Sequence, residues 1–163
     1  MIVLVKVGDE LILTEACNSF CPDRLIPNEC LNDRGLIVKK KSEEWVTLYP
    51  TTRSHESVTF HITFADGNDS ITAETTHRYT NYFAMQKRQA YANNYENLKD
   101  IFGEKRLTPR DSIKTRKYRD RNEAFTILGN VSYPMEQIRD KIYIAPFFNE
   151  PMSKNPSRQE SRL

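Results

Sequence analysis

Residues 119–144 read RDRNEAFTILGNVSYPMEQIRDKIYI. The stretch begins at the end of a basic run, and an acid, Glu123, then stands directly before an apolar segment at 124–128. Phe, Thr and Ile in that segment favour a β-strand, which the Gly-Asn pair at 129–130 is expected to end. Residues 142–144 predict a second strand. Nearby cations favour the ionised form of a carboxylate, and partial burial strengthens the electric field of that carboxylate. Glu123, at the mouth of the strand, is therefore the first candidate functional residue.

The positive charge of the chain is concentrated in residues 104–121, which we call the cationic segment. The whole chain has a formal net charge of only +2, whereas this segment contains eight basic and three acidic residues. The segment therefore carries +5 and the remainder of the chain −3. Such an asymmetry points to a localised anionic partner.

Single-stranded nucleic acid is the anionic partner that this segment fits best. Cations neutralise phosphates, and an aromatic ring placed between them can stack on a base. No recognition helix for duplex DNA is evident in the sequence. The predicted contacts are Arg116, Lys117, Tyr118, Arg119 and Arg121. The alternative is a solvated loop in which the tyrosine ring only packs against its surroundings.

A second clear strand signal lies upstream, at residues 58–64, which read VTFHITF. Apolar and polar side chains alternate there with a period of two, so one face is apolar and the other carries His61 and Thr63. The polar face is the one that is available for chemistry.

Residues 75–102 predict the long helix of the chain. Met85, Gln89 and Tyr91 fall near helical spacing, several alanines favour a helix, and Gly103 is a stop signal.

Shorter strands are expected at residues 2–7, 11–14, 36–38 and 45–49. Together with the elements above they predict an α+β fold: a small twisted, mostly antiparallel sheet in two pieces with one long helix packed on it. Residues 1–149 are expected to form a single domain. The Asn-, Pro- and Ser-rich composition of residues 150–163 predicts a disordered tail.

Composition limits the cellular setting. The chain has 163 residues, of which 38% are hydrophobic, and its mean hydropathy is −0.68. No apolar run approaches the roughly 18–20 residues that a membrane span needs, and the apolar start lacks the pattern of a signal peptide. We therefore expect a cytoplasmic protein without a membrane partner.

Three cysteines occupy positions 17, 21 and 30. An odd number without a secretion signal predicts reduced thiols. Their spacing could supply three zinc ligands, but no histidine lies nearby to complete the set. Small buried hydrophobic side chains are the favoured interpretation, and no metal is expected.

Two patches of the sequence resemble a known family. The first comprises Arg119, Arg121, Glu123, the apolar run 125–128, Pro134, Ile138 and Ile142. The second reads FADGN at 64–68 and then YTNYF at 79–83. In this order, and over about half of the chain, the patches are similar to segments of the ADP-ribosyltransferase fold. The closest similarity is to the DarT-type toxins that modify single-stranded DNA.

The resemblance implies an NAD-dependent ADP-ribosyltransferase acting on nucleic acid or protein, with NAD as its substrate. In that reaction the bond from nicotinamide to ribose breaks through a cation-like state that a carboxylate stabilises, and the resemblance gives this role to Glu123. One departure is that the family has Ala before this Glu, whereas Ala124 follows it here. The family's N-terminal His and Arg also have no counterpart. Arg53, His61 and Thr63 are the substitutes expected to hold NAD.

The alternative role for Glu123 is an acid paired with Arg119 or Arg121 at the end of a strand. The protein would then be a catalytically degenerate relative, or an unrelated small intracellular protein. Either would act by binding nucleic acid or a protein partner, as a phage or effector inhibitor does.

Overall fold

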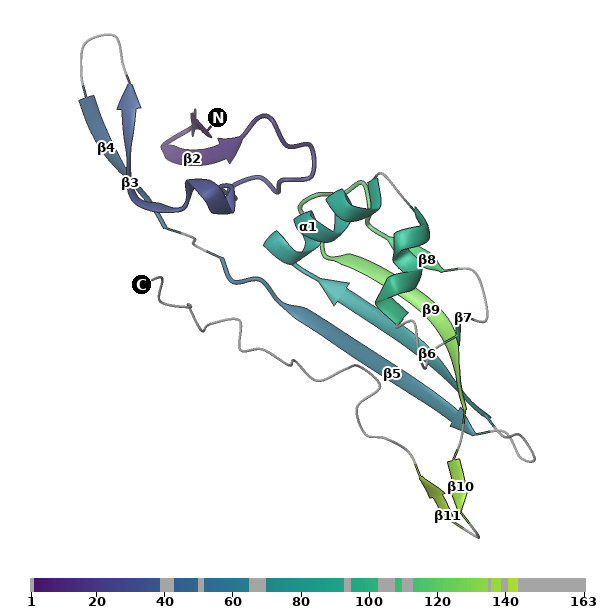
Figure 1. Cartoon of the computed structure of the whole chain (residues 1–163). Coiled ribbons are helices and arrows are strands. Elements are labelled where there is room, and N and C mark those ends of the chain that lie inside the picture. The colour runs from purple at the N-terminus through teal and green to yellow at the C-terminus, as the bar shows by residue number, and fades with distance from the viewer. Residues whose placement is uncertain are drawn as a thin grey trace, which may run out of the picture.

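The computed structural model describes residues 2–38, 43–49, 52–64, 70–92, 95–102, 108–109, 113–134, 136–138 and 141–143. Its largest unit is a five-stranded antiparallel sheet in the order β5–β6–β9–β7, with β8 also paired to β9 (Figure 1). The strands are β5 (Glu56–Phe64), β6 (Ser70–Tyr79), β7 (Thr108–Pro109), β8 (Lys114–Arg116) and β9 (Phe125–Pro134). The two strongest strand predictions, 58–64 and 124–128, therefore belong to one sheet.

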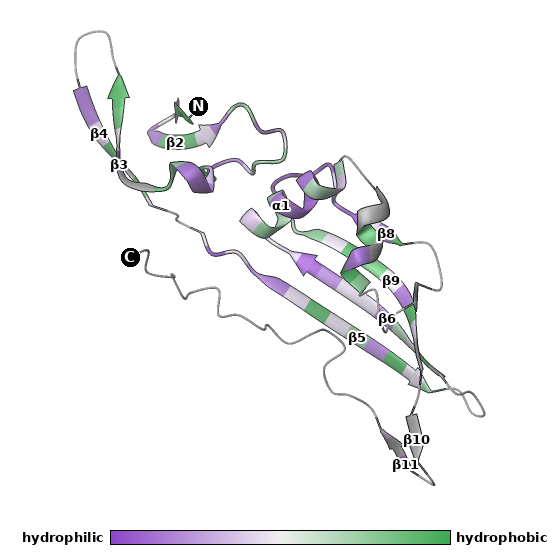
Figure 2. Cartoon of the chain, viewed as in Figure 1, coloured by the Kyte–Doolittle hydropathy of each residue, from purple (hydrophilic) through white to green (hydrophobic). Residues whose placement is uncertain are grey.

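Strands β5 and β6 follow from a period-two pattern. Apolar and polar residues alternate along β5, which appears as coloured bands (Figure 2). In β6 the alternate residues Ile71, Ala73, Thr75, His77 and Tyr79 are all buried. The prediction of a helix from residue 75 is thus wrong for residues 75–79, because their side chains alternate between two faces of a sheet.

The helical elements begin later and are shorter than predicted. Helix α1 covers Asn81–Ala92, and the 3₁₀-helix η2 covers Tyr95–Phe102. Both lie on the same side of the large sheet (Figure 1). The buried stripe of α1 includes Met85, Arg88 and Tyr91, whereas Gln89, which was predicted to lie on the apolar stripe, is exposed.

Strand β9 runs straight through the Gly-Asn pair that was expected to end it. The reason is packing: a Cβ atom at Gly129 would lie 2.6 Å from Cζ of Phe102. The glycine thus lets the buried ring of Phe102 approach the strand closely. Oγ1 of Thr75 also donates a hydrogen bond of 2.9 Å to the carbonyl of Gly129.

The core lies between the sheet and the two helical elements. Its buried members are Ala73, Tyr79, Ala84, Tyr91, Leu98, Phe102, Ile113, Phe125, Ile127 and Val131. A smaller cluster of Cys21, Leu25, Tyr82 and Met85 joins α1 to the segment before β3.

Three antiparallel hairpins complete the described structure. They pair β1 (Ile2–Val7) with β2 (Glu10–Glu15), β3 (Asn32–Val38) with β4 (Glu43–Leu48), and β10 (Glu136–Ile138) with β11 (Lys141–Tyr143). A short 3₁₀-helix, η1 (Asn28–Cys30), precedes β3. The first hairpin turns at Gly8, whose φ of 62° favours glycine.

The predicted α+β class, with a helix packed on a mostly antiparallel sheet, is confirmed. The division of the sheet differs, since the described strands form one five-stranded sheet and three two-stranded ones. The predicted tail at 150–163 and position 144 of the predicted last strand lie outside the described residues. None of the described helices combines the length and apolar character that a membrane crossing requires.

Candidate nucleic-acid interface

The large sheet has one face that no described element covers, and we call it the open face. The strand register places its side chains in rows across β5, β6, β9 and β8. The rows are Ser57–Arg78–Thr126–Arg116, Thr59–Thr76–Leu128–Lys114, His61–Glu74–Asn130 and Thr63–Thr72–Ser132. The opposite face carries Phe125 and Ile127, which are fully buried under α1 and η2.

Hydroxyl groups and cations dominate the open face. Glu74 is the single acid among the residues of the four rows. In the first row Arg78 and Arg116 stand on either side of Thr126, and both arginines are exposed. Adjacent strands lie about 4.8 Å apart, so the two Cα atoms are separated by about 10 Å. The geometry suits successive anionic groups of an extended chain.

The described part of the cationic segment continues from this row. Arg116 lies in β8, and the chain then turns through a loop at 117–124 before it enters β9. Arg119 is exposed in that loop. Lys117 forms an ion pair of 3.3 Å with Asp120, so part of the positive charge of the loop is compensated within it.

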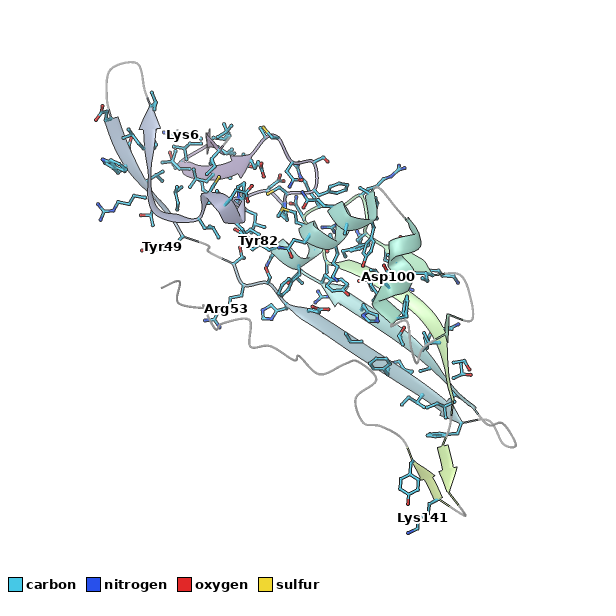
Figure 3. The ribbon with its side chains drawn as sticks, in the orientation of Figure 1. Lys6, Tyr49, Arg53, Tyr82, Asp100 and Lys141 are labelled. Carbon is cyan, nitrogen blue, oxygen red and sulfur yellow. The ribbon has the colours of Figure 1, made fainter. Side chains whose placement is uncertain are left out.

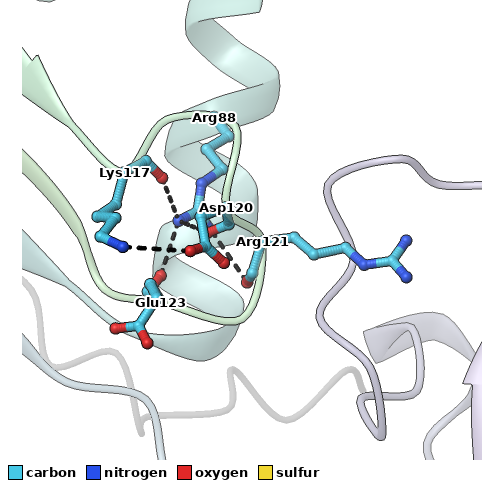
Figure 4. Close-up of polar contacts among 5 residues, drawn as sticks. All are labelled: Arg88, Lys117, Asp120, Arg121 and Glu123. Carbon is cyan, nitrogen blue, oxygen red and sulfur yellow. Dashed lines mark hydrogen bonds and ion pairs between the residues drawn. The ribbon is translucent and has the colours of Figure 1, made fainter.

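A buried arginine of α1, Arg88, binds the main chain of this loop (Figure 4). Nη2 of Arg88 donates hydrogen bonds to the main-chain carbonyls of Lys117, Asp120 and Glu123, at 2.9, 2.8 and 2.7 Å. Nη1 donates to the carbonyl of Arg121 at 3.3 Å. A guanidinium fork can reach several acceptors at once, which a lysine ammonium does less well. The loop is therefore fixed by its backbone.

The burial of Arg88 is complete, and burial lowers the pKa of its guanidinium while the carboxylate of Asp120 opposes that shift. The guanidinium also lies 5.5 Å from the ring centre of Phe125. Its Nε is buried without a hydrogen-bond partner. Arg88 was not among the site residues predicted from the sequence, although its spacing from Met85 and Tyr91 places it on the buried stripe of the helix.

Tyr118 does not present a free ring. Its ring is half-buried and packs against Phe125 and Phe20, with ring centres 5.7 and 5.8 Å apart. Its hydroxyl donates a hydrogen bond of 3.4 Å to the carbonyl of Arg88. These contacts match the alternative in which the tyrosine packs rather than stacks on a base.

Arg121 connects the loop to the N-terminal part of the chain. Its Nη2 lies 2.5 Å from Oδ1 of Asp23 in an ion pair. Asn122 adds two hydrogen bonds with the same residue, because its Nδ2 donates to Oδ2 of Asp23 and its Oδ1 accepts from the main-chain N–H of Asp23. Asp23 thus competes with any other anion for Arg121.

His61 and Thr63, which were expected to help hold NAD, lie apart from Glu123, the expected catalytic residue. Glu123 is exposed, and its main-chain carbonyl rather than its carboxylate is the group that Arg88 binds. His61 and Thr63 lie exposed on the open face. The register puts His61 about 13 Å along the sheet and about 10 Å across it from Thr126 on β9, the strand that begins just after Glu123.

Arg53 lies in the connection before β5 (Figure 3). Its main-chain carbonyl accepts a hydrogen bond of 2.7 Å from Nδ2 of Asn81, at the start of α1. The neighbouring Ser54 accepts one through its Oγ from the N–H of Tyr82. These bonds fasten the connection to the beginning of the helix, and the Arg53 side chain is exposed.

The cysteines behave as separate thiols. Cys17 is exposed, Cys30 is half-buried, and Cys21 is buried with its Sγ 3.4 Å from the carbonyl of Leu25. Burial, followed by the charge of Glu15, raises the pKa of the Cys21 thiol to about 11, so it stays protonated at neutral pH. Within the described ranges no three His, Cys, Asp or Glu side chains are grouped as metal ligands.

The open face and the adjoining loop at 117–124, which we call the cationic loop, are therefore the strongest candidate site. Comparison with known family models, curated proteins and solved structures finds no match to this chain.

Proposed function

We propose that the protein binds single-stranded nucleic acid through the open face and the adjoining cationic loop. The observation that carries the proposal is the row in which Arg78 and Arg116 flank Thr126, both arginines being exposed on an uncovered sheet face. Lys114 stands in the next row of the same face, and Arg119 is exposed in the loop beyond. The positive groups thus follow a line along which a phosphate backbone can lie.

The character of the site favours contacts with the phosphate backbone over base stacking. The four rows contain no aromatic side chain except His61, and the ring of Tyr118 is used in packing. Hydroxyl groups such as those of Thr59 and Thr126 bind phosphate and sugar oxygens without reading sequence. We therefore expect weak dependence on sequence and strong dependence on salt.

The salt dependence has a predictable size. Arg78, Lys114, Arg116, Lys117 and Arg119 are the cations within the proposed path. For a single strand, log K falls against log salt with a slope of about −0.7 per neutralised phosphate. Contact with all five groups gives a slope of about −3.5, and the ion pair of Lys117 with Asp120 lowers the magnitude toward about −3.

The test is fluorescence polarisation with a short labelled single-stranded oligonucleotide at several salt concentrations. The Arg78→Glu, Arg116→Glu double variant should lose more than ten-fold in affinity and show a shallower slope. Arg34→Glu, an exposed change on the β3–β4 hairpin, is the matched control and should bind as the wild type does. Wild-type binding that ignores salt, or equal losses in both variants, would contradict the proposal.

A further inference from the structure

A separate cavity lies among the N-terminal hairpins, away from the open face. It has a volume of about 430 Å³ and is bounded by β1, β2, β4, the segment before η1 and the start of α1. Tyr49 and Tyr82, both labelled in Figure 3, belong to its lining. Apolar walls come from Leu4, Leu13 and Val46. The volume falls within the range of about 300–1,000 Å³ that is typical of small-molecule sites.

An ion pair is part of the lining of this cavity. Nη1 and Nη2 of Arg24 lie 2.6 and 3.0 Å from the two carboxylate oxygens of Glu10, so the pair is bidentate. Arg24 has a φ of 69°, in the left-handed region that non-glycine residues avoid. Strained backbone of this kind is concentrated at ligand clamps and other functional positions. Arg24 thus contributes both an ion pair and an uncommon backbone conformation to the lining of the cavity.

We infer that this cavity binds a small molecule with an apolar body and one uncharged amide group. The apolar walls take the body of the molecule, and the Glu10–Arg24 pair takes its polar end. The inference is independent of nucleic-acid binding, because no residue of the four rows lines the cavity.

The ion pair selects the amide. Glu10 supplies hydrogen-bond acceptors, and Arg24 keeps N–H donors beyond the two used in the pair. An amide both donates and accepts, so it can bind both partners at once. A carboxylate end would be attracted by Arg24 but repelled by Glu10, and an ammonium end would be attracted by Glu10 but repelled by Arg24. The pair has no net charge, so it offers neither ion a net attraction. At about 30 Å³ for each water-sized group, 430 Å³ holds about 14 non-hydrogen atoms.

Three probes with the same apolar chain separate the charges: octanamide, octanoate and octylammonium. Binding to the full chain is followed by titration calorimetry and by NMR chemical shifts. Octanamide should bind at least five-fold more tightly than either charged probe. Failure of octanamide to bind, or equal binding of all three probes, would overturn the inference.

Val46 and Val38 provide a matched pair of variants on one hairpin. Val46 is half-buried and lines the cavity, whereas Val38 is 88% exposed and does not. Val46→Trp should fill the cavity and weaken octanamide binding by more than ten-fold, while Val38→Trp should leave it unchanged. Wild-type affinity in Val46→Trp would refute the site.

Arg24→Gly keeps the inference testable if a cavity-filling change fails to fold. Glycine adopts a φ of 69° without strain, and the ion pair that the variant loses is exposed. The variant should therefore fold with a stability close to that of the wild type. It should nevertheless lose the preference for octanamide over octylammonium, because the repulsion by Arg24 is removed. An unchanged preference would show that Arg24 is not part of a ligand site.

Discussion

At residue 88 a guanidinium without exposed surface meets four main-chain carbonyls. Burial of a charge is costly, and here the hydrogen bonds to the 117–123 loop offset that cost. Each bond is charge-assisted, which makes it stronger than a bond between neutral groups. The side chain thus couples α1 to a loop that lies 29 to 35 residues further along the sequence.

Arg88→Ala should lower the free energy of unfolding by roughly 3–5 kcal/mol, since it removes four hydrogen bonds that a buried charged donor makes to loop carbonyls. Arg88→Lys should recover only part of the loss, because an ammonium cannot span the same acceptors. Urea denaturation measures both changes. Arg78→Ala, an exposed change, is the control and should cost less than about 0.5 kcal/mol. An equally small loss in the free energy of unfolding for Arg88→Ala would mean that the loop keeps its conformation without Arg88.

His77 makes stability depend on pH. Burial, assisted by the charge of Lys87, lowers the pKa of this imidazole to about 4. An unfolded histidine has a pKa of about 6.5, so between about pH 4 and about pH 6.5 this imidazole is protonated in the unfolded chain but neutral in the folded protein. The free energy of unfolding therefore falls as the pH decreases from about 6.5 to about 4, by up to about 3 kcal/mol.

The measurement is urea denaturation across that pH range for two variants. His77→Gln removes the titrating group and should flatten the pH dependence, although a buried amide alters the stability at neutral pH. His61→Gln, on the exposed open face, should keep the wild-type slope. If both variants retain the slope, other groups cause the acid sensitivity.

At the scale of elements, the close packing of η2 against β9 depends on Gly129. A methyl group at this position would meet the ring of Phe102 at 2.6 Å, and that ring is itself buried. Gly129→Ala should therefore destabilise the protein by roughly 1–3 kcal/mol through overpacking. Adding Phe102→Leu to Gly129→Ala should recover part of this loss by making room, as a double-mutant cycle in thermal unfolding would show. Strict additivity of the two changes would argue against the contact.

The pattern of side chains predicted β5 well and β6 poorly, and the reason is physical. Strand β5 has apolar residues at every second position, whereas β6 alternates Ala73, Thr75 and His77 with threonines and charges. Such residues give little period-two alternation of apolar and polar side chains. The alanines of the following helix favour helical structure, so the predicted helix began too early, at residue 75. Sequence periodicity likewise could not reveal that Gly129 sits under an aromatic ring, since that contact forms only in the folded protein.

The candidate site was partly predictable for a similar reason. The cationic segment was visible from charge alone, and Arg116 and Arg119 are exposed as expected. Charge does not reveal which cations are already compensated, so the pairing of Arg121 with Asp23 required the tertiary structure. The contribution of Arg78 also required it, because only the strand register places that residue beside Thr126.

At the scale of the whole molecule, Asp23 links the N-terminal part of the chain to the proposed nucleic-acid path. Asp23→Ala removes an anion that holds Arg121 and should raise oligonucleotide affinity by roughly two- to five-fold at low salt. The increase should disappear in the Asp23→Ala, Arg121→Ala double variant. Glu10→Ala, which removes an acid of the separate cavity, is the control. A decrease in affinity after Asp23→Ala would mean that the docked arrangement itself is needed for binding.

ADP-ribosyl transfer stays a prediction of the sequence resemblance and has its own test. Labelled NAD is incubated with the full chain and single-stranded oligonucleotide or mixed protein acceptors. Transfer that Glu123→Gln abolishes would identify Glu123 as a catalytic residue. Oligonucleotide binding without any transfer would leave binding as the activity of the chain.

The hydrogen bonds of Arg88 go to main-chain carbonyl oxygens rather than to side chains, and this has an evolutionary consequence. Every amino acid supplies the same carbonyl, so the outward side chains of the 117–123 loop can change while its anchoring persists. Residues such as Arg119 and Glu123, both exposed, are free to diverge with little cost to the core. A lineage built on this scaffold can therefore retarget the loop by a few substitutions, much as an antibody framework tolerates new sequences in its hypervariable loops.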